Sequence, residues 1–374
     1  MRKTDLKYAL TFGTCVLSIL VPVFLINFIY DPGEIYFQKM IKGKYVNDYV
    51  KMLLSSPSGV REFANERAVK AQLARYAGPY NTVIYGSSRI MQLSPLHMSN
   101  FNGSFPAPAL NLAASAWTLE DTLIFTRLLL QNPKMPQAMV ISMDPWALRW
   151  NVSERYSILK EDLTAMFNDL GVKRTTQKPE LYLIKLLVNS ISFEYFVQSL
   201  KRLFDPSFKI IPDNHLKNYE EVKNPNIADG YDFDQGYDIQ ITLKDGSRVF
   251  SKKTIGDLKN DYAQGNVGFV GQEGEYWDDN AIDIFEKMIT YVRKKGTEVY
   301  FVLIPFSPLV FEQGHAADRD RLLAVEQKIR ELAAKNNITV LGTYDPQKSH
   351  LEANDFFDCQ HPKPSTLGKF DFRH

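Results

Sequence analysis

The sequence predicts an α/β domain with a mostly parallel sheet, preceded by one apolar segment at the N-terminus. Three observations predict this arrangement. Residues 8–30 contain no charged side chain, and from residue 82 onward short apolar runs alternate with amphipathic helical segments. The apolar runs are almost continuously hydrophobic, which is typical of strands in a parallel sheet that is covered on both faces. With 374 residues, of which 45% are hydrophobic and 23% charged, the chain is long enough to bury a large core.

The apolar segment, residues 8–30, is predicted to be a single transmembrane anchor that contacts the lipid bilayer. As a helix it would just cross a hydrocarbon core of about 30 Å. Basic residues precede it and Asp31 and Glu34 follow it, which favours a cytoplasmic N-terminus. The sequence therefore predicts a single-pass protein of the cytoplasmic (inner) membrane whose main domain lies on the periplasmic or extracellular side. A cleaved signal peptide is the alternative, but the run is longer than a normal signal core and no small-x-small cleavage site follows it.

Charge and cysteine content exclude other classes of protein. The formal net charge is +1 with no long basic run, so the electrostatic footprint of a nucleic-acid-binding protein is missing. Of the two cysteines, Cys15 lies in the apolar segment and Cys359 is alone in the rest of the chain. No intrachain disulfide can therefore join the folded part, which must depend on its own core.

Behind the anchor (residues 1–30, with its cytoplasmic tip), we expect a helical juxtamembrane stalk over residues 31–79 that ends at Gly78-Pro79. The α/β domain is expected over residues 80–374. Its strands are predicted in the apolar runs "TVIYG", "PALNLAAS", "AMVISMD", "EVYFVLIPFS" and "ITVLGTY". Its main helices are predicted after the cap pair Thr118 and Asp121, in "DIFEKMITYVRKKG" and in "RLLAVEQKIRELAAKNN". In each of the last two, the apolar residues form one helical face: Ile282, Phe285, Ile289 and Val292 in the first, and Leu322, Val325, Ile329 and Leu332 in the second.

An inserted α+β region, about residues 151–279, interrupts this alternation. Apolar helical segments give way there to a polar stretch, in which Tyr237, Ile239, Ile241 and Leu243 alternate before Asp245-Gly246. Such alternation before Asp-Gly predicts a β-hairpin. We expect the insertion to cap or border a cleft.

The first predicted strand runs directly into Gly86-Ser87-Ser88-Arg89, which makes a serine nucleophile possible. Ligands of open parallel sheets bind beyond the carboxyl ends of the strands, where this turn would lie. A nucleophilic serine needs a base, and the base needs a carboxylate that orients it. Asp358 and His361 fit these roles, since they share a loop after the last strand. The alternatives are an ordinary glycine-serine turn and a pair that only caps a terminal turn.

These motifs resemble the SGNH, or GDSL-like, hydrolase superfamily, in which a Gly-x-Ser after the first strand acts with a C-terminal Asp-x-x-His. The resemblance covers about residues 82–150 and 280–361. It implies a three-layer sandwich, with Ser88 as nucleophile, His361 as general base and Asp358 as its orienting partner. Together with the N-terminal anchor, it is closest to membrane-anchored proteins of cell-envelope acylation, including the D-alanyl transfer protein of teichoic acids and relatives that O-acetylate exported polysaccharides.

The chain departs from that superfamily at the oxyanion hole. The resemblance implies donors from a Gly after the second strand and an Asn after the third, but Ser115 lies in the Gly region and Asp144 stands in the Asn position. The backbone N–H groups of Ser88 and Ser115 remain candidate donors. An ionised Asp144 cannot donate and would repel a developing oxyanion. Arg89 could compensate electrostatically, although a surface ion pair is the commoner fate of such a residue.

Other site chemistry has less support. Trp117, Trp146 and Trp150 could stack on sugar rings or belong to the core. No cofactor motif or zinc spacing is present. A metal held by Asp355, Asp358 and His361 lacks a recognisable partner set. Cys359 is a poor nucleophile because acidic neighbours raise the pKa of a thiol.

The predicted function is therefore a membrane-anchored, extracytoplasmic serine O-acyltransferase that modifies a cell-envelope glycopolymer or exported polysaccharide without a cofactor. The resemblance implies an acyl donor and a multi-spanning membrane acyltransferase that supplies the acyl group. Two alternatives remain: an esterase or deacetylase of envelope glycans, and a non-catalytic SGNH-like scaffold of an acylation complex.

Overall fold

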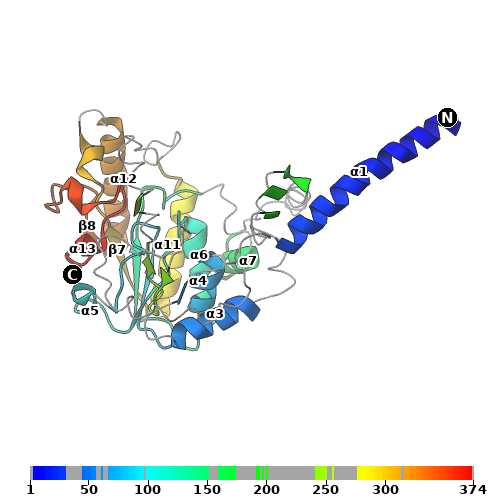
Figure 1. Cartoon of the computed structure of the whole chain (residues 1–374). Coiled ribbons are helices and arrows are strands. Elements are labelled where there is room, and N and C mark those ends of the chain that lie inside the picture. The colour runs from blue at the N-terminus through cyan, green and yellow to red at the C-terminus, as the bar shows by residue number, and fades with distance from the viewer. Residues whose placement is uncertain are drawn as a thin grey trace. The chain divides into compact units, whose positions relative to one another are not determined.

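The computed structural model describes residues 3–30, 44–55, 60–61, 66–96, 98–150, 159–173, 191–193, 196–197, 199–200, 241–250, 255–256, 276–312 and 316–372 (Figure 1). Contacts divide the chain into two compact units. Unit 1 comprises Met1–Asn47 and Thr175–His215, and unit 2 comprises Asp48–Arg174 and Leu216–His374.

In unit 1 the main element is helix α1, Lys3–Tyr30. Its stretch Leu10–Ile29 is long and apolar enough to cross a membrane. Near its C-terminal end, the side chain of Asn27 is buried. The amide of Asn27 donates to the carbonyl of Ser192 at 3.4 Å, and its oxygen accepts from the hydroxyl of Ser199 at 2.9 Å. These bonds hold Ser192 and Ser199 against α1.

Unit 2 is built around a sheet of five parallel strands in the order β3-β2-β4-β7-β8. The predicted α/β class and parallel sheet are thereby confirmed. Because β3 and β4 lie on opposite sides of β2, the direction of winding reverses beside β2, and ligand sites of open sheets lie at such a reversal. The strands are β2 (Thr82–Tyr85), β3 (Ala109–Asn111), β4 (Ala138–Ser142), β7 (Glu298–Leu303) and β8 (Thr339–Gly342).

The helices of unit 2 follow the predicted amphipathic pattern. Thr118 and Asp121 form the predicted capping box at the start of α6. Helices α4 and α11 both pack on α6 (Figure 1), and the apolar positions predicted for α11 and α12 are buried. The longer helices are α3 (Lys44–Ser55), α4 (Glu66–Arg75), α6 (Leu119–Leu129), α7 (Lys160–Asp169), α11 (Asp279–Lys294) and α12 (Ala316–Lys335). Shorter ones are α5 (Ser99–Asn102), η3 (Pro308–Phe311), η5 (Ala353–Asp355) and α13 (Pro364–Leu367).

The segment predicted as a stalk, residues 31–79, differs in the structure. The second part of this segment belongs to unit 2, which includes Asp48–Arg174, and α4 buries Val69 and Leu73. Arg67 also lies inside, in a bidentate pair with Asp121 at 2.8 Å. Helix α4 is therefore part of the folded unit, because both its apolar and its charged side chains have partners there.

A smaller antiparallel sheet, β1-β5-β6, contains the hairpin predicted at Asp245-Gly246. Its strands are β1 (Val60–Arg61), β5 (Ile241–Thr242) and β6 (Arg248–Val249). Gly246 has a φ of +79°, and a side chain there would collide with the backbone oxygen of Asn111. Only glycine fits this turn. Tyr237, Ile239 and most of the predicted insertion lie outside the described residues.

Candidate functional site

The serine turn follows β2 directly, at the carboxyl edge of the parallel sheet. Gly86 has a φ of +156°, and an added Cβ would lie 2.6 Å from both Ile90 Cγ2 and Ser142 Cβ. A glycine is therefore needed for the chain to turn so close to β4. Of the two serines after it, Ser87 is buried and Ser88 is half-buried, so Ser88 is the more accessible.

A short closed loop near the C-terminus carries the other two predicted residues. A β-bridge between Phe356 and Pro362 closes this loop. Inside it, Asp358 Oδ1 accepts the backbone N–H groups of Gln360 at 2.8 Å and of His361 at 2.6 Å. Asp358 Oδ2 lies 2.6 Å from His361 Nδ1. The carboxylate thus fixes both the backbone and the ring of His361.

Ser88, His361 and Asp358 form one hydrogen-bonded chain, although Ser88 and His361 are 273 positions apart. His361 Nε2 lies 2.8 Å from Ser88 Oγ. If Nδ1–H donates to Asp358, Nε2 is unprotonated and accepts from the serine hydroxyl. Burial alone would raise the pKa of Asp358, but the charge of His361 and the N–H groups of His361 and Gln360 lower it below its ordinary value. The carboxylate is therefore ionised at neutral pH, and the structure brings the three predicted residues together in their predicted order.

The two backbone N–H groups considered as oxyanion donors differ in availability. Among the described residues no acceptor is bonded to the N–H of Ser88. The N–H of Ser115 donates to Glu66 Oε2 at 3.0 Å, and Glu66 Oε1 pairs with Arg248 at 2.9 Å. Burial of Glu66 would raise its pKa, but Arg248 and other cations lower it, so Glu66 is ionised. The Ser115 donor is therefore occupied in this conformation.

Asp144 and Arg89, the remaining oxyanion candidates, pair with each other inside the protein. Arg89 Nη1 lies 3.1 Å from Asp144 Oδ1, and both side chains are at most 2% exposed. The expectation of a surface ion pair for Arg89 is therefore wrong, because its side chain points inward and pairs with a buried carboxylate. Burial raises the pKa of Asp144, and the charge of Arg89 opposes this shift. Arg89 also donates to the carbonyls of Ile304, Pro305 and Gln360, which leaves at most one of its five N–H groups for a substrate.

The tryptophans considered as sugar platforms lie in aromatic packing. Trp117 is 3% exposed, packs on Phe125 with ring centroids 4.8 Å apart, and donates to Thr122 Oγ1 at 2.7 Å. Its core position excludes stacking on a sugar. Trp146 is half-buried and donates to the carbonyl of Trp117 at 2.8 Å, and Trp150 is half-buried with its ring edge on Phe167.

Two alternative chemistries were considered for the residues of this loop, a metal site and a cysteine nucleophile. Within the described residues no group of three or more His, Cys, Asp or Glu side chains could hold a metal ion. Asp355, the third ligand of the metal alternative, instead accepts the N–H of Glu352 at 2.8 Å. Burial and the charge of Asp358 raise the pKa of the Cys359 thiol to about 11, as the sequence predicts.

Sequence reasoning missed several side chains around the site. Glu66 and Arg248 lie far from the serine turn and from the Asp358–His361 loop in the sequence, and no local pattern connects them to Ser115. Phe250, which follows β6, places its ring 6.4 Å from the ring of His361. The predicted hairpin could have indicated that this part of the insertion approaches the site.

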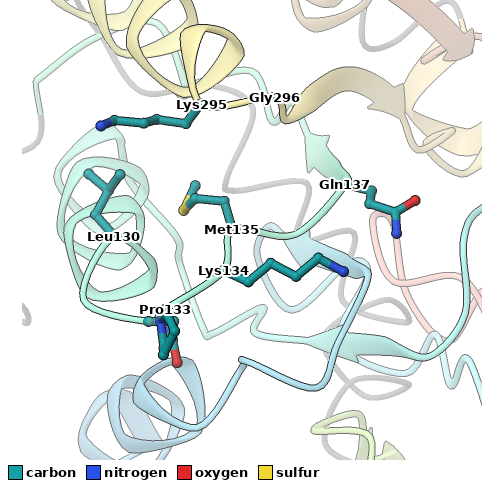
Figure 2. A pocket seen from close by; sticks show the side chains of 8 residues that line it. Leu130, Pro133, Lys134, Met135, Gln137, Lys295 and Gly296 are labelled. Carbon is teal, nitrogen blue, oxygen red and sulfur yellow. The ribbon is translucent and has the colours of Figure 1, made fainter.

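A separate cavity of about 460 Å³ lies at the amino ends of the parallel strands, opposite the serine turn (Figure 2). It is lined by residues at the end of α6, before β4 and between α11 and β7, including Met135, Lys134 and Lys295. Since β4 and β7 begin here and the serine turn follows the end of β2, this cavity does not belong to the Ser88 site.

No protein-family model matches the sequence, and no curated protein matches it significantly. The functional argument therefore depends on the residues and their geometry.

Proposed function

We propose that this protein is a membrane-anchored serine O-acyltransferase of the SGNH type that acts on a cell-envelope glycopolymer or exported polysaccharide. The hydrogen-bonded chain Ser88–His361–Asp358 carries the proposal. This chain has the distances needed for a serine nucleophile, a general base and an orienting carboxylate. The three-layer SGNH sandwich is part of the proposal, and the parallel sheet with the serine turn at its carboxyl edge supports it.

In the first half of the reaction, Ser88 Oγ attacks the carbonyl carbon of an acyl donor while His361 Nε2 takes the hydroxyl proton. The negative charge on the carbonyl oxygen is stabilised by the N–H of Ser88. The bond to the leaving group then breaks, and His361 returns its proton to that group. An acyl ester on Ser88 remains.

In the second half, a hydroxyl of the glycopolymer replaces the leaving group. His361 Nε2 takes the proton of this hydroxyl as its oxygen attacks the acyl ester, and returns it to Ser88 Oγ when the ester bond to the enzyme breaks. Asp358 stays ionised and stabilises the imidazolium in both halves. With water as acceptor the same steps give an esterase or deacetylase.

Membrane placement is the second part of the proposal. Residues 8–30 anchor the protein in the cytoplasmic membrane, with unit 2 on the periplasmic or extracellular side, and a multi-spanning acyltransferase supplies the acyl group. The length and apolar character of α1 support the anchor. A reporter enzyme that needs an extracytoplasmic environment, fused to the C-terminus, should be active, and activity of a cytoplasmic reporter there would contradict this topology.

A non-catalytic scaffold is the second candidate, and one observation favours it. Ser115 N–H is occupied by Glu66, and Asp144 is held by Arg89. Among the candidate oxyanion donors, the N–H of Ser88 is then the one that is available. An incomplete oxyanion hole is what a non-catalytic scaffold would show.

Labelling with a fluorophosphonate serine probe separates these functions. In full-length protein purified in detergent, Ser88→Ala and His361→Ala should abolish labelling and hydrolysis of p-nitrophenyl acetate, whereas Ser87→Ala should retain both. A folded wild type that neither reacts with the probe nor hydrolyses the ester would favour the scaffold. Acyl transfer to added oligosaccharide, compared with release to water, then distinguishes transferase from esterase.

A further inference from the structure

Arg89, the residue directly after Ser88, is 1% exposed. An arginine stays charged in proteins and is rarely buried unless it is paired. Here Asp144 supplies the pairing charge, 3.1 Å from Nη1. Removing both charges from water has a substantial free-energy cost, so this pair needs further bonds that compensate it.

Those bonds connect Arg89 with three other segments at the carboxyl edge of the sheet. Asp144 follows β4. Nη2 donates to the carbonyl of Pro305 at 3.0 Å, after β7, and the guanidinium carbon lies 3.7 Å from the ring centre of Phe306 in the same segment. Nε donates to the carbonyl of Gln360 at 3.2 Å, in the C-terminal loop. One side chain thus joins the serine turn to all of these segments.

The bond to Gln360 has the most direct relation to the catalytic chain. Two consecutive residues, Ser88 and Arg89, bond to two consecutive residues, His361 and Gln360, at 2.8 and 3.2 Å. A pair of parallel connections resists both sliding and rotation of the loop, whereas the Ser88–His361 bond alone would allow rotation. We propose that Arg89 is a positioning residue that holds the loop of His361 against the serine turn and so fixes the Ser88–His361 geometry. This inference rests on the proposed function, because it assigns Arg89 to the same site.

Lysine should not be able to replace Arg89. The guanidinium presents its N–H groups in a rigid plane that reaches acceptors on several sides and stacks on an aromatic face. A lysine ammonium has its three donors on one atom and no planar face. It could keep the pair with Asp144 but would lose the bond to Gln360 or to Pro305.

The test compares Arg89→Lys with wild type in full-length protein. The second-order rate of fluorophosphonate labelling and kcat for p-nitrophenyl acetate should both fall by about 10–100-fold, the effect expected when a reacting group is misplaced by about 1 Å. The dissociation constant of the ester, measured from burst kinetics, should not change, since Arg89 does not touch the ester. Arg330→Lys is the matched control, because Arg330 also combines an ion pair, with Glu326, and a backbone contact, with Gly342. It should label at the wild-type rate.

A second variant covers the case in which Arg89→Lys does not fold. Asp144→Asn keeps the shape of the side chain but removes the charge that holds Arg89, so it should label more slowly. Labelling at the wild-type rate or faster would overturn the proposal, because the Ser88–His361 geometry would then not depend on the charge that holds Arg89. Wild-type labelling of a folded Arg89→Lys would overturn it as well.

Hydrogen exchange separates failure of this inference from failure of the proposed function. The backbone amides of residues 356–361 should exchange faster in Arg89→Lys than in wild type, whether or not the protein reacts with the probe. Unchanged exchange in this loop would contradict the positioning role. An unreactive wild type would contradict the enzyme function instead.

Discussion

Asp358→Asn isolates the role of the carboxylate in the hydrogen-bonded chain Ser88–His361–Asp358. Asp358 accepts two backbone N–H groups at Oδ1 and the ring N–H of His361 at Oδ2. In the variant, the amide oxygen can keep the two backbone donors, which leaves the amide NH₂ facing His361 Nδ1. Nδ1 must then accept, and the ring proton moves to Nε2. Nε2 would donate to Ser88 Oγ and could no longer act as its base.

The wrong tautomer should reduce kcat by about 10⁴-fold, as it does in serine hydrolases with the same arrangement. This loss corresponds to about 5.5 kcal/mol of transition-state stabilisation, at about 1.4 kcal/mol for each factor of ten. Fluorophosphonate labelling and p-nitrophenyl acetate hydrolysis measure it, with Asp283→Asn, an exposed helix residue, as the control. A folded Asp358→Asn that loses less than about tenfold would refute the assignment of Asp358 as the orienting carboxylate.

Acid stability gives an independent test of the same residue. Because the folded protein lowers the pKa of Asp358, the ionised form contributes stability that is fully present above the unfolded pKa of about 3.9. That contribution is lost as the pH falls through the lower pKa of the folded state. Wild type should therefore lose this part of its free energy of unfolding below about pH 4, and Asp358→Asn should not. Equal acid dependence of the two proteins would contradict the pKa shift.

Two further predictions concern the neighbours of Ser88 and of Asp358. Gly86→Ala should lower the free energy of unfolding by about 1–3 kcal/mol, since its Cβ would overlap Ile90 and Ser142. Denaturant unfolding measures this change, with Gly78→Ala as the control, because a Cβ there meets its nearest neighbour at 3.7 Å. A loss of stability no larger than that of Gly78→Ala would contradict the prediction. Cys359 should resist alkylation in native Cys15→Ser protein, because a pKa of about 11 instead of 9.0 makes its thiolate about 100-fold rarer at neutral pH. Mass spectrometry of iodoacetamide-treated protein should find modification of Cys359 only after unfolding. Rapid modification of the native protein would contradict the burial of the thiol.

The sequence allowed prediction of the sheet and its main helices because their periodicity is strong. Leu322, Val325 and Ile329 repeat at helical spacing, and all three are buried as predicted. Helix α4 was harder because its pattern contains Arg67 and Lys70, which resemble solvent-facing residues. They are buried because Asp121 and the carbonyl of Asn111 accept their N–H groups, and such partners can be found only after the chain has folded.

The candidate site also combines residues that a local sequence signal identifies with contacts that form only in the folded chain. Gly86, Ser88 and the spacing of Asp358 and His361 are local signals, so the three members of the hydrogen-bonded chain could be named from the sequence. What holds them cannot be named in this way. Arg89 bonds to the backbone carbonyl of Gln360, which any residue at that position would provide. The residues next to Arg89 in the sequence do not show whether its side chain is buried or faces solvent.

The two departures from the SGNH pattern have a common physical form. Ser115 N–H is bonded to a carboxylate that Arg248 balances, and Asp144 is a carboxylate that Arg89 balances. Each pair is close to neutral, so neither contributes a strong field to an oxyanion, and the N–H of Ser88 is the donor left among the candidates. Because one such donor is typically worth about 3–4 kcal/mol, a site that lacks the second should depend more on its acyl donor. Activated esters, with good leaving groups, should therefore acylate Ser88 far faster than simple alkyl esters.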